Sequence, residues 1–324
     1  MSGRFFARAG ILLACAFAGI SPGIAQLERG AFASCADILA EAERLACYDK
    51  ASAPRQDPPV ASKDSSLLGE AWALDPDSAR IDLGLYQPNY LLPVRHTDRV
   101  NSAPFAGSAS PGTSGQTIED IEAKFQVSFK ARVASAFDRR LGVWLAYTQQ
   151  SQWQVYNAEA SRPFRETNYS PEAIVMFDPR TEIFGLRWRL AGVSFNHQSN
   201  GRAEPLSRSW NRVIGQFGFE RGAFALMLRP WTRIKEDPTK DDNPDITTYL
   251  GHGDLTMLVK WHEHSFNVML RGGEGAVQVN WTGPRWLGPL RGYVQLFSGY
   301  GESLIDYNWR QTTVGIGVAL NDLF

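Results

Sequence analysis

The chain closes with Thr313-Val314-Gly315-Ile316-Gly317-Val318-Ala319-Leu320-Asn321-Asp322-Leu323-Phe324. Bulky apolar residues alternate here with small or polar residues, and the last residue is aromatic. Residues two apart on a β-strand point to the same side of a sheet. The alternation therefore predicts a strand with one bulky apolar face and one small or polar face.

Similar short runs occur upstream, from residue 120 onward, with turn residues between them. The clearest run is Lys124–Lys130, in which Phe125, Val127 and Phe129 share one face. The other runs are Gly142–Gln150, Ala173–Phe177, Val193–Asn196, Val213–Phe219, Phe224–Trp231, Thr256–Trp261, Phe266–Arg271, Ala276–Trp281, Arg291–Phe297 and Thr312–Asn321. Their length and spacing are typical of antiparallel hairpins.

Aromatic residues gather near the ends of these runs, among them Trp144, Trp210, Trp231, Trp261, Trp281 and Trp286. This placement is typical of the aromatic girdle of a membrane-spanning barrel, although a soluble β-sandwich also alternates. An alternating last strand that ends in Phe324 is similar to the assembly signal of bacterial outer-membrane barrels. Together these features predict an all-β fold, an antiparallel transmembrane β-barrel of about 12 strands with a small N-terminal helical extension.

The N-terminus has the pattern of a secretory signal peptide. Two arginines precede the apolar run Ile11–Ile20, and Ala25 suits cleavage, so residues 1–25 are interpreted as the signal. Cys15 leaves a lipoprotein signal as the alternative. No later apolar run approaches the roughly 20 residues that a membrane-spanning helix needs. We therefore expect export to the outer membrane of a Gram-negative cell, which the chain would cross as a multi-pass barrel.

Residues 26–66 are expected to form a small helical segment and a linker, and residues 67–324 the barrel domain. Cys35 and Cys47 flank a stretch with helical spacing. One unbroken helix would hold these cysteines about 18 Å apart, too far for a disulfide. A bridge would require the helix to begin or break between them, and the pairing is left open. The stretch Ser52–Ser66, rich in Pro, Ser, Lys and Asp, is a linker by composition.

The charge balance gives no support to a nucleic-acid partner. The chain has 33 Lys and Arg residues against 34 Asp and Glu residues, so no strong field of either sign is expected. The apolar share of 44% is enough for a large buried or lipid-facing surface.

A candidate active site lies where one of the runs reaches His197 and Ser199. On a strand these two residues point to the same side, which brings an imidazole near a hydroxyl. A serine becomes a good nucleophile when a base takes its proton, and neutral histidine is the usual base. Taken alone, such a pair is more often two surface residues. Apolar residues before and after Gly192 fall in opposite strand phases, which predicts a bulge or turn near that glycine.

The segment His197–Arg202, followed by Ser207–Arg212, resembles the active-site segment of outer-membrane phospholipase A. Further matching blocks follow in the same order along the chain. They are Tyr147–Gln149, Ser161 with Pro163–Tyr169, Asp241–Thr247 and Ser298–Phe324. The resemblance covers most of the chain from about residue 86 onward.

The resemblance implies a catalytic role for each of four residues. Ser199 would be the nucleophile, and His197 the general base and later the general acid. Asn211 would hold the imidazole through its amide oxygen, which orients the ring but stabilises the imidazolium less than a carboxylate does. The backbone N–H of Gly201 would stabilise the oxyanion, together with a calcium ion.

The resemblance also implies a calcium site made of oxygen ligands. These would be the Arg202 carbonyl, the Ser207 hydroxyl and a Ser161 backbone oxygen from a second subunit, so that activity depends on a homodimer. Apart from the resemblance, the acidic segment Asp237–Asp245 could be a calcium loop, but its composition favours a solvated turn.

Gln149 matches a polar position at the dimer interface of that family, where an amide facing lipid would seek a partner amide. The alternative is a lumen-facing side chain. Two departures from the family pattern bear on calcium binding. Gln198 replaces an acid, and Ala203-Glu204 replaces a Ser-Asp pair, which leaves the charge near the ion in question.

The function implied is calcium-dependent hydrolysis of acyl ester bonds in phospholipids and lysophospholipids, at both acyl positions, regulated by dimerisation. The alternative is a catalytically silent outer-membrane barrel, such as a channel or a structural protein. A soluble lipase would need a Gly-x-Ser-x-Gly elbow, which is absent around Ser199.

Overall fold

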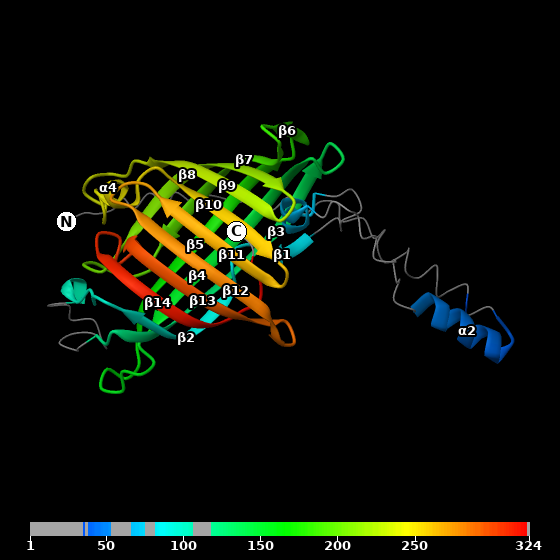
Figure 1. The fold of residues 1–324 in the computed structure, drawn as a ribbon, viewed down its shortest axis with the longest axis horizontal. Helices are drawn as coiled ribbons and strands as arrows, with labels where there is room; N and C mark the ends of the chain where they lie inside the picture. Colours follow the sequence, from blue (N-terminus) through cyan, green and yellow to red (C-terminus); the bar gives the residue numbers. More distant parts are fainter. Residues whose placement is uncertain (1–34, 36–37, 53–65, 75–81, 106–117, 323–324) are drawn as a thin grey trace, which may run out of the picture. The chain divides into compact units, whose positions relative to one another are not determined.

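The computed structural model describes Cys35 and residues 38–52, 66–74, 82–105 and 118–322 (Figure 1). The chain divides into two units, residues 1–61 and 62–324. The predicted signal peptide lies outside the described residues. Within the described ranges, no helix has both the length and the apolar character needed to cross a bilayer.

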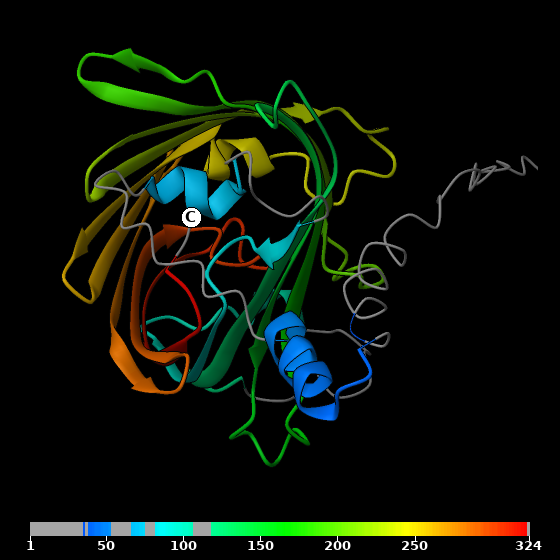
Figure 2. The same cartoon turned by 90° about the vertical axis from the view of Figure 1, so that its right-hand side faces the viewer.

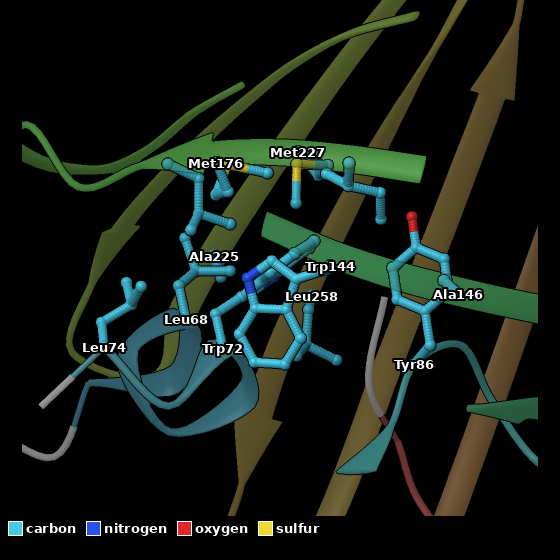
Figure 3. Packing of buried hydrophobic residues seen from close by; sticks show 12 residues of the cluster. Leu68, Trp72, Leu74, Tyr86, Trp144, Ala146, Met176, Ala225, Met227 and Leu258 are labelled. Atoms are coloured by element: carbon cyan, nitrogen blue, oxygen red, sulfur yellow. The ribbon is translucent and has the colours of Figure 1, made fainter. Parts of the chain in front are cut away.

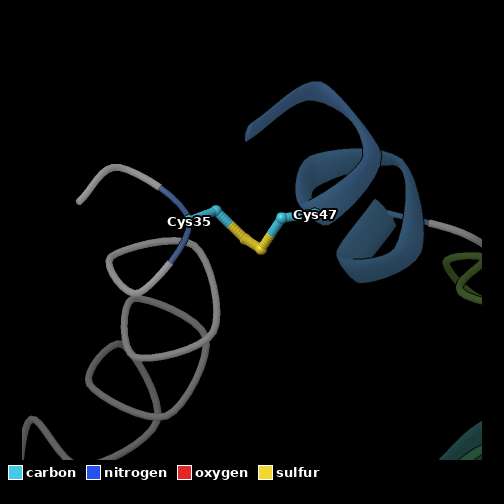
Figure 4. The surroundings of a disulfide bond; sticks show 2 residues. All are labelled: Cys35 and Cys47. Atoms are coloured by element: carbon cyan, nitrogen blue, oxygen red, sulfur yellow. A yellow bond between two sulfur atoms is a disulfide. The ribbon is translucent and has the colours of Figure 1, made fainter. Parts of the chain in front are cut away.

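The N-terminal unit contains helix α2 (Glu41–Ser52) and a disulfide between Cys35 and Cys47 (Figure 4). The Cα atoms of the two cysteines are 5.6 Å apart. This is the ordinary separation for a disulfide, and it arises because α2 begins at Glu41, between the cysteines. The helix thus begins between the two cysteines, as a disulfide between them requires, and Cys35 and Cys47 are paired.

Twelve antiparallel strands close the second unit into a barrel (Figures 1 and 2). They are β2 (Tyr90–Thr97), β3 (Ile121–Ala136), β4 (Leu141–Trp153), β5 (Phe164–Phe177), β7 (Leu186–Ser199), β8 (Ser209–Arg221), β9 (Phe224–Ile234), β10 (Gly253–Trp261), β11 (His264–Arg271), β12 (Ala276–Leu287), β13 (Leu290–Tyr300) and β14 (Arg310–Ala319). β14 pairs with β2, and β3 with both β2 and β4, so the sheet has no free edge. The predicted fold class is confirmed.

Four short strands and helices accompany the barrel strands. They are β1 (Asp82–Leu85), which pairs with β3, β6 (Thr181–Ile183), which pairs with β7, α3 (Leu67–Trp72) and α4 (Ile246–Leu250). Ala103–Phe105 forms one turn of 3-10 helix.

Each run predicted from the sequence overlaps a barrel strand, but β2 was missed. Its sequence does not alternate, because Leu91, Leu92 and Pro93 are consecutive apolar residues. The register of β2 shifts against both neighbours in this region, between Leu92 and Arg95 on one side. Proline has no N–H to donate, and a bulge accommodates it in the sheet.

Alternation places apolar side chains on the outer wall and polar side chains in the lumen. On β3, Val127 and Phe129 are exposed on the outside, whereas Lys124 and Lys130 are buried inside. Such a wall can face lipid because every strand edge is paired and the polar groups face inward.

The predicted aromatic girdle is wrong for three of its six tryptophans. Trp144, Trp210 and Trp231 are buried, whereas Trp261 and Trp286 are 60% and 79% exposed. The position of an aromatic residue near a strand end does not decide its face; the strand phase does.

Helix α3 lies inside one end of the barrel (cyan helix in Figure 2). Trp72 packs edge-on against Trp144, with ring centroids 5.6 Å apart, and the Lys130 ammonium lies 3.5 Å from the Trp72 ring centre. Figure 3 shows Leu68 and Trp72 of α3 among residues of the barrel wall. The backbone N–H of Leu68 donates to Glu220 of β8 at 2.9 Å, which fastens the helix to the wall.

The loop between β13 and β14, residues 301–309, is held in the lumen by buried ion pairs. Glu302 binds Arg95 and Lys124, the latter at 2.9 Å, and Asp306 binds Arg165 at 3.0 Å. All five side chains are at least 95% buried. Buried charges of this kind are tolerated only when they are paired and hydrogen-bonded, so the loop is locked to the strands.

Candidate active site

His197 and Ser199 lie on the outer wall, near the end of β7. The strand phase is set by Val193 and Phe195, each 48% exposed, which alternate with the buried Ser194 and Asn196. His197 and Ser199 continue the exposed phase. This register agrees with the prediction that His197 and Ser199 point to the same side of the strand.

The phase change in β7 lies earlier than predicted. The register between β7 and β8 shifts between Trp188 and Leu190, not near Gly192. Trp188 stacks on Phe219 of the outer wall, and Leu190 is fully buried. The extra residue between them moves every later side chain of β7 to the opposite face of the sheet. This shift brings His197 to the outside.

Antiparallel pairing of β7 with β8 places Asn211 directly opposite His197. The Nδ1 atom of His197 lies 2.9 Å from the Oδ1 atom of Asn211. An amide oxygen only accepts, so in this arrangement Nδ1 carries the imidazole proton. In the neutral ring the other nitrogen, Nε2, is then the unprotonated one and can act as a base.

Ser199 lies between Tyr169 of β5 and Ser209 of β8. Its hydroxyl makes no hydrogen bond with any residue that the structure describes. Catalytic hydrogen bonds often tighten only when substrate is present, so this arrangement is compatible with a nucleophile beside its base.

Gly201 is the second residue of the loop after β7 and has a φ of +65°. A Cβ atom added there would lie 3.2 Å from the Tyr169 ring, so both the backbone conformation and the space favour glycine. The Gly201 N–H has no acceptor in the described part of the chain. It is therefore free to donate to an oxyanion.

Asn200 folds the loop that follows. It is buried, its backbone N–H donates to the Arg208 carbonyl at 3.0 Å, and its side chain donates to the Leu206 carbonyl at 2.8 Å. The Asn200 Oδ1 atom accepts the backbone N–H groups of Arg202 and Arg208. These bonds fix the backbone on both sides of Ser207.

The surroundings of Ser207 contain oxygen atoms of the kind that calcium prefers. The Ser207 hydroxyl donates to Asp242 at 2.5 Å. Glu204 is also hydrogen-bonded to Asp242, and this bond, with the negative charge of Asp242, raises the pKa of Glu204. Two carboxyl groups in contact disfavour each other's ionisation, and a divalent cation would relieve that repulsion. Hydroxyl, carbonyl and carboxyl oxygens fit calcium rather than zinc.

The described residues contain no group of three or more His, Cys, Asp and Glu side chains arranged to hold a metal. The segment Asp237–Asp245 is only in part the solvated turn that its composition favoured. Asn243 is fully buried and accepts the Ser209 backbone N–H at 3.0 Å, and Asp241 binds Arg233. Exposed turns lie around Asp237 and at Pro244-Asp245, on either side of the buried Asn243.

Ser161 lies in the loop between β4 and β5, where it is exposed and has a φ of +60°. Within the described chain, no hydrogen bond joins it to Arg202 or Ser207. Arg202 instead donates to the backbone carbonyls of Phe164 and Arg165. Within one subunit Ser161 is therefore exposed and makes no hydrogen bond to the Ser207 loop.

Gln149 of β4 lies on the outer wall, so the lumen-facing alternative is not supported. Its strand neighbours are Val127 and Tyr169, both exposed. The Gln149 side chain accepts from Tyr147 at 3.1 Å and donates to Ser151 at 3.3 Å. Tyr147 and Gln149 thus form a small polar site on an otherwise apolar surface, and Ser151 is buried beside them.

Gln198 points to the lumen, away from His197 and Ser199. Its Oε1 atom accepts from Trp210 at 2.9 Å and from Arg212 at 3.3 Å. Gln198 and Arg212 line a lumen cavity of about 250 Å³, which the three catalytic candidates do not line. The replacement of an acid by Gln198 thus changes the lumen, and it does not bring or remove charge on the outer face.

Two further residues lie beside the site: Glu236, which the sequence did not indicate, and Asp242, which it indicated only as part of the segment Asp237–Asp245. Asp242 belongs to a matching block, but only its contact with Ser207 gives it a role. Glu236 accepts a hydrogen bond from Asn211 at 3.0 Å, although 25 positions separate them. No spacing rule covers such a contact, since it depends on the register of β8 with β9.

Comparison with known proteins gives consistent matches. The phospholipase A1 family profile matches residues 69–320. Phospholipase A1 of Escherichia coli K12 is 38% identical over 255 residues, which cover 74% of this chain and 81% of that protein. The structure of outer membrane phospholipase A from E. coli superposes with a TM-score of 0.69 at 35% identity, over 75% of this chain and 99% of that chain. A Salmonella typhi outer membrane phospholipase, described as a dimer with bound calcium, gives a TM-score of 0.72 at 34% identity, over 80% of this chain and all of that one.

Proposed function

The chain belongs to the phospholipase A1 family, and from this premise we propose that it hydrolyses phospholipid acyl esters through Ser199, His197 and Asn211 with the help of calcium. It is a phospholipase of the outer membrane, built as a β-barrel. The family assignment sets aside the alternative of a catalytically silent channel. We propose further which residues are catalytic, that calcium is the bound ion, that both acyl positions are hydrolysed and that the active form is a dimer.

The observation that carries the proposal is the 2.9 Å contact between His197 and Asn211 on the same outer face as Ser199. His197 Nε2 would take the proton of the Ser199 hydroxyl while the serine oxygen attacks the ester carbonyl. The Gly201 N–H would stabilise the negative charge on the former carbonyl oxygen. The imidazolium would then give its proton to the leaving alcohol, and a water molecule activated by the same imidazole would release the fatty acid.

The position of the site on the barrel suits an ester in the outer leaflet. Loops at this end, such as 200–208 and 235–245, are longer than the turns at the other end, such as 222–223 and 262–263. Outer-membrane barrels have long extracellular loops and short periplasmic turns. We therefore place Ser199 at the level of the outer leaflet, where a lipid would approach sideways from the membrane.

Calcium would be held by the Arg202 carbonyl and the Ser207 hydroxyl, with Asp242 and Glu204 supplying negative charge nearby. Calcium bound there would act as a Lewis acid toward the ester carbonyl. The third protein ligand would be the backbone oxygen of the partner subunit's Ser161, in keeping with the exposure of that loop. The Salmonella typhi relative, which is a dimer with bound calcium, supports both the ion and the dimer.

Gln149 would stabilise that dimer. An amide on a lipid-facing wall lacks water to bind, so a second Gln149 across a two-fold axis is a favourable partner. Dimerisation would then control activity, because the calcium site is complete only when two barrels meet.

The test is fatty-acid release from mixed micelles of detergent and phospholipid labelled separately at each acyl position. The native protein, Ser199→Ala and the matched control Ser209→Ala are each assayed with calcium and with chelator. Ser209 faces Ser199 across the strand pair, so it controls for the loss of a hydroxyl at the same place. We expect release from both positions by the native protein and by Ser209→Ala with calcium, and none by Ser199→Ala. Undiminished release by Ser199→Ala, in calcium and in chelator alike, would show that the proposed mechanism is wrong.

A further inference from the structure

Asn211 has a second hydrogen-bond partner on the side away from His197. Its Nδ2 atom donates to the Glu236 carboxylate at 3.0 Å. Glu236 follows β9 by two residues, and Ile234, the last residue of β9, is the register partner of Asn211. Glu236 thus lies in the same strand phase as Ile234, which is exposed on the outer wall. The contacts join His197 of β7, Asn211 of β8 and Glu236, just beyond the end of β9, in one row.

An asparagine has two ways to face a histidine, and only one supports catalysis. If Nδ2 faced His197, the Nδ1 atom of the ring would have to accept, and the proton would move to Nε2. An imidazole protonated on Nε2 cannot take the proton of Ser199. The orientation of the Asn211 amide therefore decides whether the base is in its active form.

A carboxylate settles this choice because it can only accept hydrogen bonds. Glu236 bonds to Nδ2 of Asn211 and has no way to bond to Oδ1, so it turns Oδ1 toward His197. We propose that Glu236 is a positioning residue that fixes the Asn211 amide and thereby the tautomer of His197. This inference rests on the proposed function, since it concerns the same reaction.

The charge of Glu236 adds a second effect. An amide stabilises the imidazolium less than the carboxylate of an ordinary triad does. A hydrogen bond from Nδ2 to a carboxylate polarises the amide, which makes Oδ1 a stronger acceptor for the charged ring. Asn211 is neutral, so the negative charge of Glu236, acting through the polarised amide, helps to stabilise the His197 imidazolium.

The first experiment replaces Glu236 in the full-length protein in mixed micelles with saturating calcium. Because Glu236 acts through Asn211, we expect Glu236→Ala to lower kcat by about 10-fold while KM stays unchanged. Glu236→Gln keeps an acceptor for Nδ2 and should lose less. Asp237→Asn, a change in the neighbouring exposed turn that touches neither Asn211 nor His197, is the matched control and should keep the native kcat. A native kcat for Glu236→Ala would overturn the inference.

The second experiment makes the sign of the effect diagnostic. In Asn211→Asp, two carboxylates face each other and neither can donate, so Glu236 becomes unfavourable. In that background Glu236→Gln can donate from Nε2 to the new aspartate, and we expect it to raise kcat. The same substitution lowers kcat when Asn211 is present. A merely structural role would give the same sign in both backgrounds, and that result would contradict the proposal.

Ser199→Ala, measured alongside, separates the two proposals. If Ser199→Ala is inactive and the Glu236 variants behave as the native protein, only the role of Glu236 is wrong. If Ser199→Ala keeps activity, the proposed function itself fails, whatever the Glu236 variants do.

Discussion

The outer and inner faces of strands β7 and β8 share a backbone and have opposite environments. On the inner face, Gln198 is hydrogen-bonded to the buried Trp210, whose ring also lies against the Arg212 guanidinium at 4.0 Å. On the outer face, His197 and Asn211 belong to a single row of hydrogen bonds at the edge of a lipid-facing wall. The alternation of a strand thus separates side chains that hold the barrel together from side chains that are open to the outside of the barrel.

The strongest way to break the outer face is His197→Ala. Without the base, kcat should fall by ~10⁴-fold or more, as for other members of nucleophile-base pairs. The free energy of unfolding should change little, because His197 is only partly buried. Fatty-acid release and urea unfolding in detergent measure the two quantities, and a matching loss of stability would show that the faces are not independent.

The matching change inside the lumen is Glu302→Gln. The Glu302 side chain is 1% exposed, and its neutralisation removes the carboxylate partner of Lys124 and one of the two carboxylate partners of Arg95, which keeps Glu122. We expect the free energy of unfolding to fall by about 3 to 5 kcal/mol. The kcat of the protein that remains folded should stay native. A native unfolding midpoint would mean that the lumen ion pairs contribute nothing to the barrel.

Gln198→Leu tests whether the inner and outer faces are independent at neighbouring positions, since Gln198 lies between His197 and Ser199 in the sequence and points inward. It removes the acceptor of Trp210 and should destabilise the barrel by about 1 to 2 kcal/mol with little change in kcat. Gln198→Glu keeps the acceptor and should be nearly as stable as the native protein. If Gln198→Leu abolished activity at native stability, the inner face would take part in the chemistry.

The smallest expected effect concerns the outer wall away from His197 and Ser199. Gln149→Leu should weaken dimerisation by about 1 kcal/mol. Sedimentation equilibrium in detergent with calcium measures the dimer constant, and Leu145→Ala, a change of an exposed apolar residue on the same strand, is the control. Equal dimer constants for Gln149→Leu and the native protein would remove Gln149 from the interface.

The sequence predicted the barrel because alternation, as in Lys124–Lys130, follows directly from strand geometry. It missed β2, where Pro93 and a bulge break the pattern. It also assigned Trp144, Trp210 and Trp231 to the wrong face, because a phase is not fixed by nearness to a strand end.

The site could be predicted only in part for a similar reason. His197 and Ser199 share one strand, so spacing alone puts them on one side. Asn211 is on the next strand, and its place opposite His197 depends on the length and folding of the loop between them, so its role came from the resemblance. Glu236 depends on a second register, beyond the end of β9, and no sequence pattern indicated it.

The central claim is that Ser199 is a nucleophile activated by His197 on the outer wall. The direct measurement is mass spectrometry of the protein after reaction with a long-chain alkyl sulfonyl fluoride, a reagent that modifies activated serines. We expect one adduct on the peptide that contains Ser199, and none when His197→Ala is treated in the same way. An adduct on another residue of the native protein, or equal labelling of Ser199 in His197→Ala, would contradict this account.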